Sequence, residues 1–127
     1  MKKLFAILSL CGLLTILFAA CGGSSSGSSN TANTVHMSDA NFVQNSITIK
    51  KGEHVTLVND AGVIHIIENG LWDSNGTAKP AIESGAPKIE AQVQGNGTQT
   101  IGPFNTIGTY HLYCSVHPGM NLTITVR

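Results

Sequence analysis

The chain has little charge and few aromatic side chains. Charged residues make up 11% and aromatic residues 6% of its 127 residues, whereas an average soluble domain is ~25% charged. Basic and acidic side chains are equal in number, seven each, so the clustered positive charge of a nucleic-acid-binding protein is missing. The apolar fraction of 42% argues against a charge-driven disordered chain. These absences exclude nucleic acid as a partner and leave a chain long enough for one domain with a single core.

Long helical periodicity is also missing. After residue 34, no stretch of ten or more residues shows a helical period and also lacks glycine and proline. Apolar residues instead alternate or come in short runs, which predicts strands. The clearest case is 121–126, where Leu122, Ile124 and Val126 alternate with threonines and share one face.

Turn residues separate the strands. Asn96-Gly97, for example, predicts a tight turn with positive φ in a hairpin-like position. The candidate strands are 34–38, 46–50, 54–59, 63–68, 89–94, 98–101, 109–114 and 121–126. Eight short strands in under a hundred residues predict an all-β domain, an antiparallel sandwich or barrel with Greek-key links.

The segment 69–88 has no clean period. It contains the only tryptophan, Trp72, and two prolines, Pro80 and Pro87. Two interpretations stay open, a long loop or an irregular edge strand.

The N-terminus is typical of a targeting segment. Met1-Lys2-Lys3 is a short basic start, and residues 4–20 carry no charge, as in a secretory signal. The segment ends at Cys21 in the sequence LFAAC, which resembles the lipobox of bacterial lipoproteins, where the cysteine is lipidated and becomes residue one. An uncleaved transmembrane anchor is the alternative, since 17 residues lie at the short end of what spans a bilayer. Both interpretations place the remaining chain outside the cytoplasm and hold it at a membrane.

Cleavage before Cys21 leaves 127 − 20 = 107 residues, with five bases, seven acids and a net charge of −2. Residues 22–34 are glycine, serine, asparagine, threonine and alanine only, which predicts a flexible tether. We therefore expect a signal peptide over 1–20, the lipidated Cys21 and linker over 21–34, and one domain over 35–127. The expected protein is monomeric, extracytoplasmic and lipid-anchored to the cell membrane.

Cysteine is scarce, with Cys11, Cys21 and Cys114 the only examples. The first lies in the segment expected to be removed and the second is expected to carry lipid, so Cys114 has no partner. In an oxidising compartment an unpaired thiol indicates intermolecular pairing, a reactive thiol or a metal ligand.

The surroundings of Cys114 favour a metal ligand. Cys114, His117 and Met120 form the pattern C-x-x-H-x-x-M between two strands, and such a short connection can fold three donors around one point. A thiolate, an imidazole and a thioether form a soft, mixed set that suits copper as Cu(I) and Cu(II). A blue-copper centre takes two histidines and one cysteine with a long axial methionine, so a second imidazole is needed. His65, just after the turn at Gly62, is the best candidate.

The other histidines fit this site poorly. His54 follows the polar alternation of its strand, which indicates a solvated position. His111 lies three residues before Cys114 and therefore points to the opposite strand face. The pair His36-Met37, just after the tether, is interpreted as surface decoration.

The segment 110–120, the upstream Asn59-Asp60 followed by His65, and the all-β pattern resemble the cupredoxins, the small blue copper proteins of the plastocyanin and amicyanin type. The resemblance covers about residues 35–127. The gap of two residues between the last two donors is similar to the short ligand loop of amicyanins.

This resemblance implies a cupredoxin-like Greek-key β-sandwich of seven to eight strands that binds one copper ion through His65, Cys114, His117 and Met120. One position departs from the family. Many cupredoxins follow the first histidine ligand with an asparagine that braces the cysteine loop, and this chain has Ile66 there.

The function expected is one-electron transfer by a mononuclear type 1 copper site in a membrane-tethered, extracytoplasmic electron-transfer chain. Redox proteins are the expected partners, with membrane contact through lipid on Cys21. The exposed edge of His117, ringed by Pro118, Gly119 and the loop 62–64, is the expected electron port.

An enzyme is not expected, because the additional histidine clusters of copper oxidases and the G-x-S-x-G motif of hydrolases are both missing. Two alternatives stay open, a copper-binding protein for metal delivery or buffering, and a metal-free lipoprotein β-sandwich.

Overall fold

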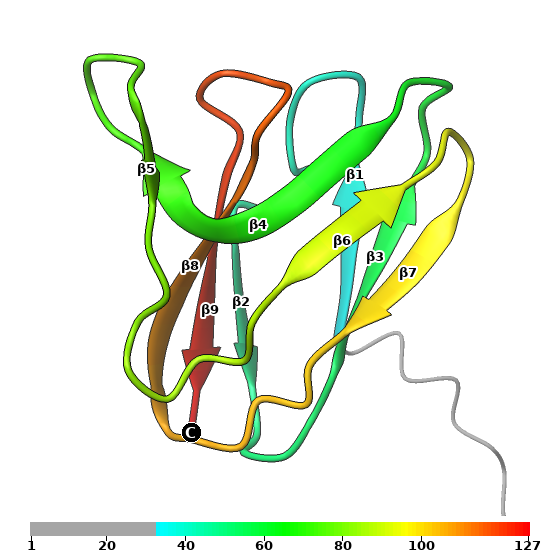
Figure 1. The fold of residues 1–127 in the computed structure, drawn as a ribbon. Coiled ribbons are helices and arrows are strands. Elements are labelled where there is room, and N and C mark those ends of the chain that lie inside the picture. The colour runs from blue at the N-terminus through cyan, green and yellow to red at the C-terminus, as the bar shows by residue number, and fades with distance from the viewer. Residues whose placement is uncertain (1–32) are drawn as a thin grey trace, which may run out of the picture.

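The computed structural model describes residues 33–127 (Figure 1). The signal peptide 1–20, Cys21 and most of the linker lie outside the described residues. The described part forms nine strands, namely β1 (Thr34–Met37), β2 (Ser46–Ile49), β3 (Val55–Asn59), β4 (His65–Trp72), β5 (Ala78–Pro80), β6 (Glu90–Val93), β7 (Thr98–Ile101), β8 (Gly108–Cys114) and β9 (Asn121–Val126). Within residues 33–127, no helix has the length and hydropathy needed to cross a membrane.

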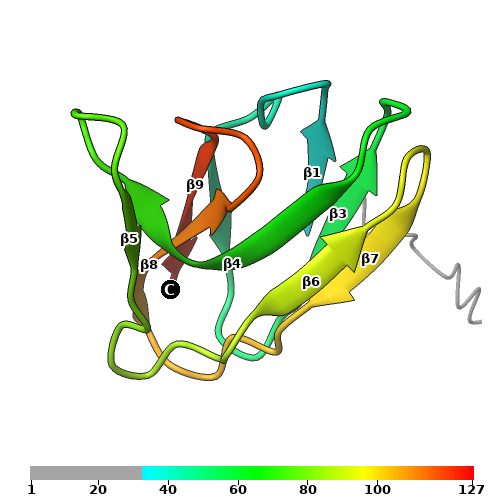
Figure 2. The same ribbon diagram turned by 45° about the horizontal axis from the view of Figure 1, so that its top comes forward.

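The strands form two sheets that face each other (Figures 1 and 2). The smaller sheet has the order β1-β3-β7, and the larger has the order β2-β9-β8-β4-β5 with β6 also paired to β4. The pairs β1–β3 and β2–β9 are parallel and the other strand pairs antiparallel. The predicted all-β Greek-key sandwich is confirmed, with nine strands in place of the seven to eight expected. The expectation of an antiparallel sandwich is wrong for β1–β3 and β2–β9.

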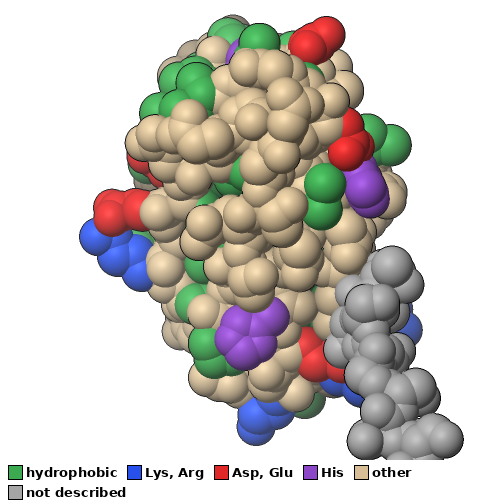
Figure 3. All heavy atoms as spheres, turned by 90° about the vertical axis from the view of Figure 1, so that its right-hand side faces the viewer, with side chains coloured by type: hydrophobic (Ala, Val, Ile, Leu, Met, Phe, Trp, Pro, Cys, Tyr) green, Lys and Arg blue, Asp and Glu red, His purple; other side chains and the backbone are tan. Residues whose placement is uncertain are grey.

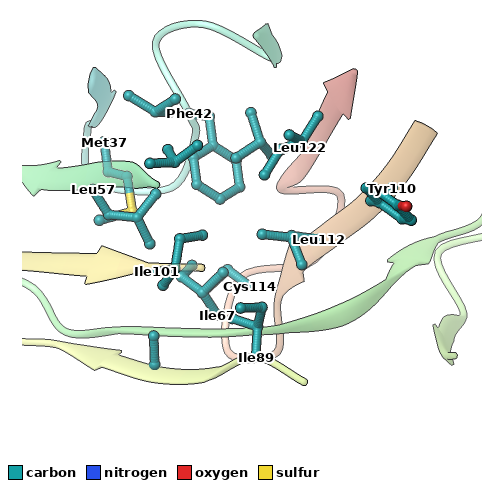
Figure 4. Close-up of a cluster of buried hydrophobic side chains, with 14 of the residues drawn as sticks. Met37, Phe42, Leu57, Ile67, Ile89, Ile101, Tyr110, Leu112, Cys114 and Leu122 are labelled. Carbon is teal, nitrogen blue, oxygen red and sulfur yellow. The ribbon is translucent and has the colours of Figure 1, made fainter. Parts of the chain in front are cut away.

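Strand alternation fills the space between the sheets. In β9 the three apolar side chains predicted to share a face are at most 1% exposed. Figure 4 shows Met37 and Leu57 of the smaller sheet and Leu112 and Leu122 of the larger in one apolar cluster around Phe42. Burial of each such side chain contributes ~1.5–3 kcal/mol. Met37 is fully buried, so the interpretation of His36-Met37 as surface decoration is wrong for Met37, whose inward face in β1 decides its position.

The Asn96-Gly97 turn has the predicted positive φ, 57° at Asn96, and is closed by a bond from the Gly97 N–H to the Gln94 carbonyl at 2.9 Å. The hairpin-like interpretation is wrong, however. β6 pairs with β4 and β7 with β3, so this turn carries the chain from one sheet to the other.

Residues 69–88, which the sequence pattern left as either a loop or an edge strand, contain the end of β4, strand β5 and a loop. β4 bends at Gly70, where φ is +127° and a Cβ atom would lie 2.3 Å from the Lys79 carbonyl oxygen. β5 returns antiparallel to this end of β4. The buried Asn69 holds the loop that follows, because its side chain accepts the Ile89 N–H at 2.6 Å and donates to the Pro87 carbonyl at 3.1 Å.

Candidate metal centre

Three predicted donors converge at one end of the sandwich. His65 begins β4, Cys114 ends β8, and His117 follows in the β8–β9 loop. One donor atom of each lies within 4.8 Å of the others. The Cys114 Sγ is 3.3 Å from Nδ1 of His117 and 3.7 Å from Nδ1 of His65. Both imidazoles thus turn the same nitrogen toward one sulfur, and this donor chemistry fits a soft, thiolate-binding metal.

Sheet pairing brings His65 and Cys114 together although 49 positions separate them. Ile67 of β4 lies opposite Cys114 of β8, and His65, two residues before Ile67, points to the same face. The Ser115 N–H continues this pairing by donating to the Ile66 carbonyl at 2.8 Å. The backbone carbonyl of Ile66 thus holds Ser115, the residue after the cysteine. The apolar side chain of Ile66 has no polar group that could brace the loop.

Met120 closes the loop that contains Cys114 and His117. The Cys114 N–H donates to the Met120 carbonyl at 3.0 Å, and the Met120 N–H donates to the His117 carbonyl at 3.2 Å. The Met120 residue is 1% exposed. The pattern C-x-x-H-x-x-M therefore forms one compact turn that ends in a buried thioether residue.

The loop before His65 is fixed by Asn59. Its buried side-chain amide donates to the carbonyls of Val63 at 2.6 Å and Gln94 at 2.9 Å, while its oxygen accepts the Ala61 N–H at 3.0 Å. The sequence singled out Asn59 only through the family resemblance. The contacts show its physical role, which is to shape the turn that leads into β4.

The surroundings of His65 favour its neutral form. Burial, and then the neighbouring His117, lower the pKa of His65, while Ser38 and Asp39 act in the opposite direction. His65 is 0% exposed, and its Nε2 atom is buried with no hydrogen bond of normal geometry. A neutral ring keeps a lone pair for a metal, and the enclosed Cys114 sulfur, also 0% exposed, is shielded from water.

Two residues at this end were missed by the sequence interpretation. The Trp72 indole N–H donates to the Cys114 carbonyl at 2.9 Å, and Asn121 bonds the Trp72 backbone. Trp72 was noticed only as the single tryptophan. The dipeptide Asn69-Gly70 is a turn signal at the bend of β4, but it does not reveal that the bend brings Trp72 to Cys114.

The other histidines lie apart from this cluster. His54 is exposed, as predicted. His36 Nδ1 contacts an Asp60 carboxylate oxygen at 2.7 Å, and His111 Nδ1 contacts Glu83 at 2.7 Å. Within residues 33–127, His65, Cys114 and His117 are the cluster of three or more His, Cys, Asp or Glu side chains able to hold a metal ion.

Known proteins resemble this chain in both sequence and fold. Plastocyanin from Ulva prolifera is 36% identical over 89 residues, covering 68% of this chain and 86% of that protein. Plastocyanin from Scenedesmus fuscus is 36% identical over 88 residues with the same coverage.

Among solved structures, a purple cupredoxin from Nitrosopumilus maritimus aligns with a TM-score of 0.54 at 22% identity, covering 74% of this chain and 98% of that one. A mutant of amicyanin in its Cu(I) form aligns with a TM-score of 0.57 at 16% identity, covering 76% of this chain and 82% of that one. These two alignments show a shared fold.

The model of the copper binding proteins of the plastocyanin/azurin family matches residues 29–127. That range contains the whole described domain, including the convergent cysteine and histidines. The chain therefore belongs to the plastocyanin/azurin family of copper binding proteins, the cupredoxins, and its cofactor is one copper ion.

Proposed function

We propose that this protein is a one-electron carrier whose type 1 copper site is formed by His65, Cys114, His117 and Met120. The observation that carries the proposal is the convergence of one sulfur and one nitrogen from each of two imidazoles within 4.8 Å, in a chain from a family of copper binding proteins. Bound copper supplies the Cu(II)/Cu(I) couple. Membership of this family also agrees with the prediction that the protein is not an enzyme.

The chain contributes preorganisation. Cys114 and His65 sit on paired strands, and His117 lies in a turn closed by backbone bonds. A donor set held by the sheets changes little between two oxidation states, which favours fast electron transfer. A site of this kind is poorly suited to metal delivery, because two of its donors are 0% exposed.

The partly exposed His117 is the proposed electron port. Exposed apolar side chains flank the two histidines in sequence, namely Val116 at 44%, and Val63 and Ile64 at 40% and 37% exposure. No lysine or arginine occurs in 59–65 or 115–121. A rim of exposed apolar side chains without lysine or arginine supports brief contacts with redox proteins.

The proposed attachment is a lipid on Cys21 after removal of residues 1–20. We expect a tether from Cys21 to the start of β1 at Thr34, followed by an extracytoplasmic, monomeric domain. β1 begins at the end of the sandwich opposite the β8–β9 loop (Figure 1). A tether that enters there leaves the metal end facing away from the membrane, toward partners.

An electron carrier differs from a copper-delivery protein in what it releases. We expect the copper-loaded protein to give reversible one-electron voltammetry and to keep its copper when a competing chelator is added. Rapid transfer of copper to the chelator, with no reversible redox wave, would favour delivery and contradict electron transfer.

A further inference from the structure

β4 meets the metal end of the molecule twice. It starts there with His65, crosses the larger sheet, and turns back at Gly70, so that its last residue, Trp72, lies beside the β8–β9 loop (Figures 1 and 2). β5 pairs with this returning end, with Trp72 opposite Ala78. The segment without a clear sequence pattern therefore supplies a second support for the ligand loop.

The contacts of Trp72 join both ends of that loop. Its indole N–H donates to the Cys114 carbonyl at 2.9 Å, whereas the other bond to this carbonyl, from the His117 N–H, is 3.4 Å long. The Trp72 N–H donates to Oδ1 of Asn121 at 2.7 Å, and Nδ2 of Asn121 donates back to the Trp72 carbonyl at 2.9 Å. Asn121 directly follows Met120, so residues 114 and 121 are tied to one residue of β4.

The indole is itself held in place. The Tyr113 ring packs edge-on against it, with centroids 5.9 Å apart at 85°, and the Tyr113 hydroxyl donates to Glu68 at 3.1 Å. The turn after Trp72 is fixed by Asp73, whose Oδ1 accepts the N–H groups of Asn75 and Thr77 at 2.9 Å each. A side chain restrained on both sides can hold a ligand peptide in one orientation.

We propose that Trp72 is a positioning residue for the copper centre, which fixes the Cys114 peptide through its indole N–H and thereby tunes the reduction potential. This inference rests on the proposed electron-transfer function. The indole replaces the bracing that the side chain at Ile66 does not provide. Its N–H dipole points its positive end at the thiolate residue, which favours the more electron-rich Cu(I) form.

The chain has one tryptophan, so the indole N–H can be removed in two ways. Trp72→Phe keeps an aromatic ring, and biosynthetic replacement of tryptophan by its benzothiophene analogue keeps the shape and loses only the donor. In both proteins we expect the ratio of Cu(I) to Cu(II) affinity to fall about threefold. Since a tenfold change in this ratio corresponds to 59 mV, the reduction potential should be lower by ~28 mV. The copper EPR hyperfine splitting changes with it.

Tyr113→Phe is the matched control. It removes a hydroxyl from the same aromatic pair, next to the same cysteine, and leaves the bond to the Cys114 carbonyl intact. We expect its potential and EPR spectrum to match the wild type. Asn121→Ala removes the two hydrogen bonds to the Trp72 backbone. We expect the potential of the double variant Trp72→Phe/Asn121→Ala to shift by less than the sum of the two single shifts, because both changes act on the same contact.

The metal-free protein gives an independent readout. The indole N–H resonance should exchange slowly with solvent in the wild type and faster in Asn121→Ala. An unchanged or raised potential in Trp72→Phe and the analogue, or a rapidly exchanging indole N–H in the wild type, would overturn the proposal. A wild-type protein without a thiolate-to-copper absorption band would instead refute the proposed function, and the role of Trp72 toward copper with it.

Discussion

At the residue scale, Asn59 carries much of the local structure near the proposed metal ligands. It is 1% exposed and makes three hydrogen bonds to backbone groups of two loops. We expect Asn59→Leu to lower the free energy of unfolding by about 2–3 kcal/mol, because two carbonyls in part-buried hydrogen bonds lose their donor and the loop loses the bond to the Ala61 N–H. Chemical denaturation of the metal-free protein measures this. Asp60→Asn changes only an exposed ion pair with His36, and an equal loss in that variant would contradict the role of Asn59.

His65 makes the stability of the metal-free protein depend on pH. Burial and His117 hold its pKa below the ordinary 6.5, so the folded chain keeps it neutral where the unfolded chain protonates it. The unfolded state then binds more protons, and stability falls as the pH drops from 6.5 toward the folded pKa. Denaturation at a series of pH values measures the slope.

We expect the slope below about pH 6.5, the ordinary histidine pKa, to flatten in His65→Gln. The exposed His54 provides the control, since His54→Gln should keep the wild-type slope. If His65→Gln retained the full slope, another group would control the acid sensitivity.

The proposed ligands differ in how visible they are in the sequence. Cys114, His117 and Met120 are close in sequence, so their spacing alone indicates a soft metal site. His65 required a resemblance and a strand argument, because only the pairing of β4 with β8 brings it to the sulfur. The contact of Trp72 with Cys114 could not be predicted, because the acceptor is a backbone carbonyl, which every residue type carries.

At the element scale, β4 depends on a residue without a side chain. Any Cβ at Gly70 would lie 2.3 Å from a backbone oxygen of β5, and its φ of +127° is strained for other residues. We expect Gly70→Ala to lower the free energy of unfolding by about 2 kcal/mol or more. It should also disrupt the β4–β5 pairing that places Trp72, seen as a shift in Trp72 fluorescence.

Gly62→Ala is the control for this substitution. A Cβ atom added at Gly62 would have no heavy atom within 4 Å, and this glycine has no positive φ. Its alanine variant should stay near wild-type stability. Equal stability of the two variants would show that the Gly70 bend is not required.

Strands were predictable where one face is buried and the other is at least partly exposed to solvent, as in β9 with its alternating threonines. β5 escaped prediction because its three residues include a proline and none is buried. Its position follows from pairing with the bent end of β4. The parallel pairs β1–β3 and β2–β9 were equally hidden, since they join segments far apart in sequence.

At the scale of the whole molecule, charge is thinly spread. Figure 3 shows a face with few charged side chains among uncharged ones. Two lysines of the described domain, Lys79 and Lys88, are paired with acids on its sides. Lys50, Lys51 and Arg127 meet where β2 and β9 end. The metal end is left without a cation in 59–65 and 115–121.

This arrangement predicts that electron exchange uses the metal end, where the exposed side chains Val63, Ile64 and Val116 are apolar. Val63→Asp, which puts a charge beside the proposed port, should slow electron self-exchange several-fold and leave the copper spectrum intact. Ile107→Asp is the control, because Ile107 is 67% exposed and directly precedes β8, whose other end carries Cys114. NMR line widths give the self-exchange rate of each variant. Equal rates in Val63→Asp and Ile107→Asp would place the port elsewhere.

The most direct test of the copper site compares the visible absorption and EPR spectra of the Cu(II)-loaded protein with those of Cys114→Ser. We expect an intense blue thiolate-to-copper band and narrow copper hyperfine splitting in the wild type, both lost in the variant. A colourless wild-type protein, or copper binding with ordinary hyperfine splitting that survives Cys114→Ser, would contradict a type 1 site built on Cys114.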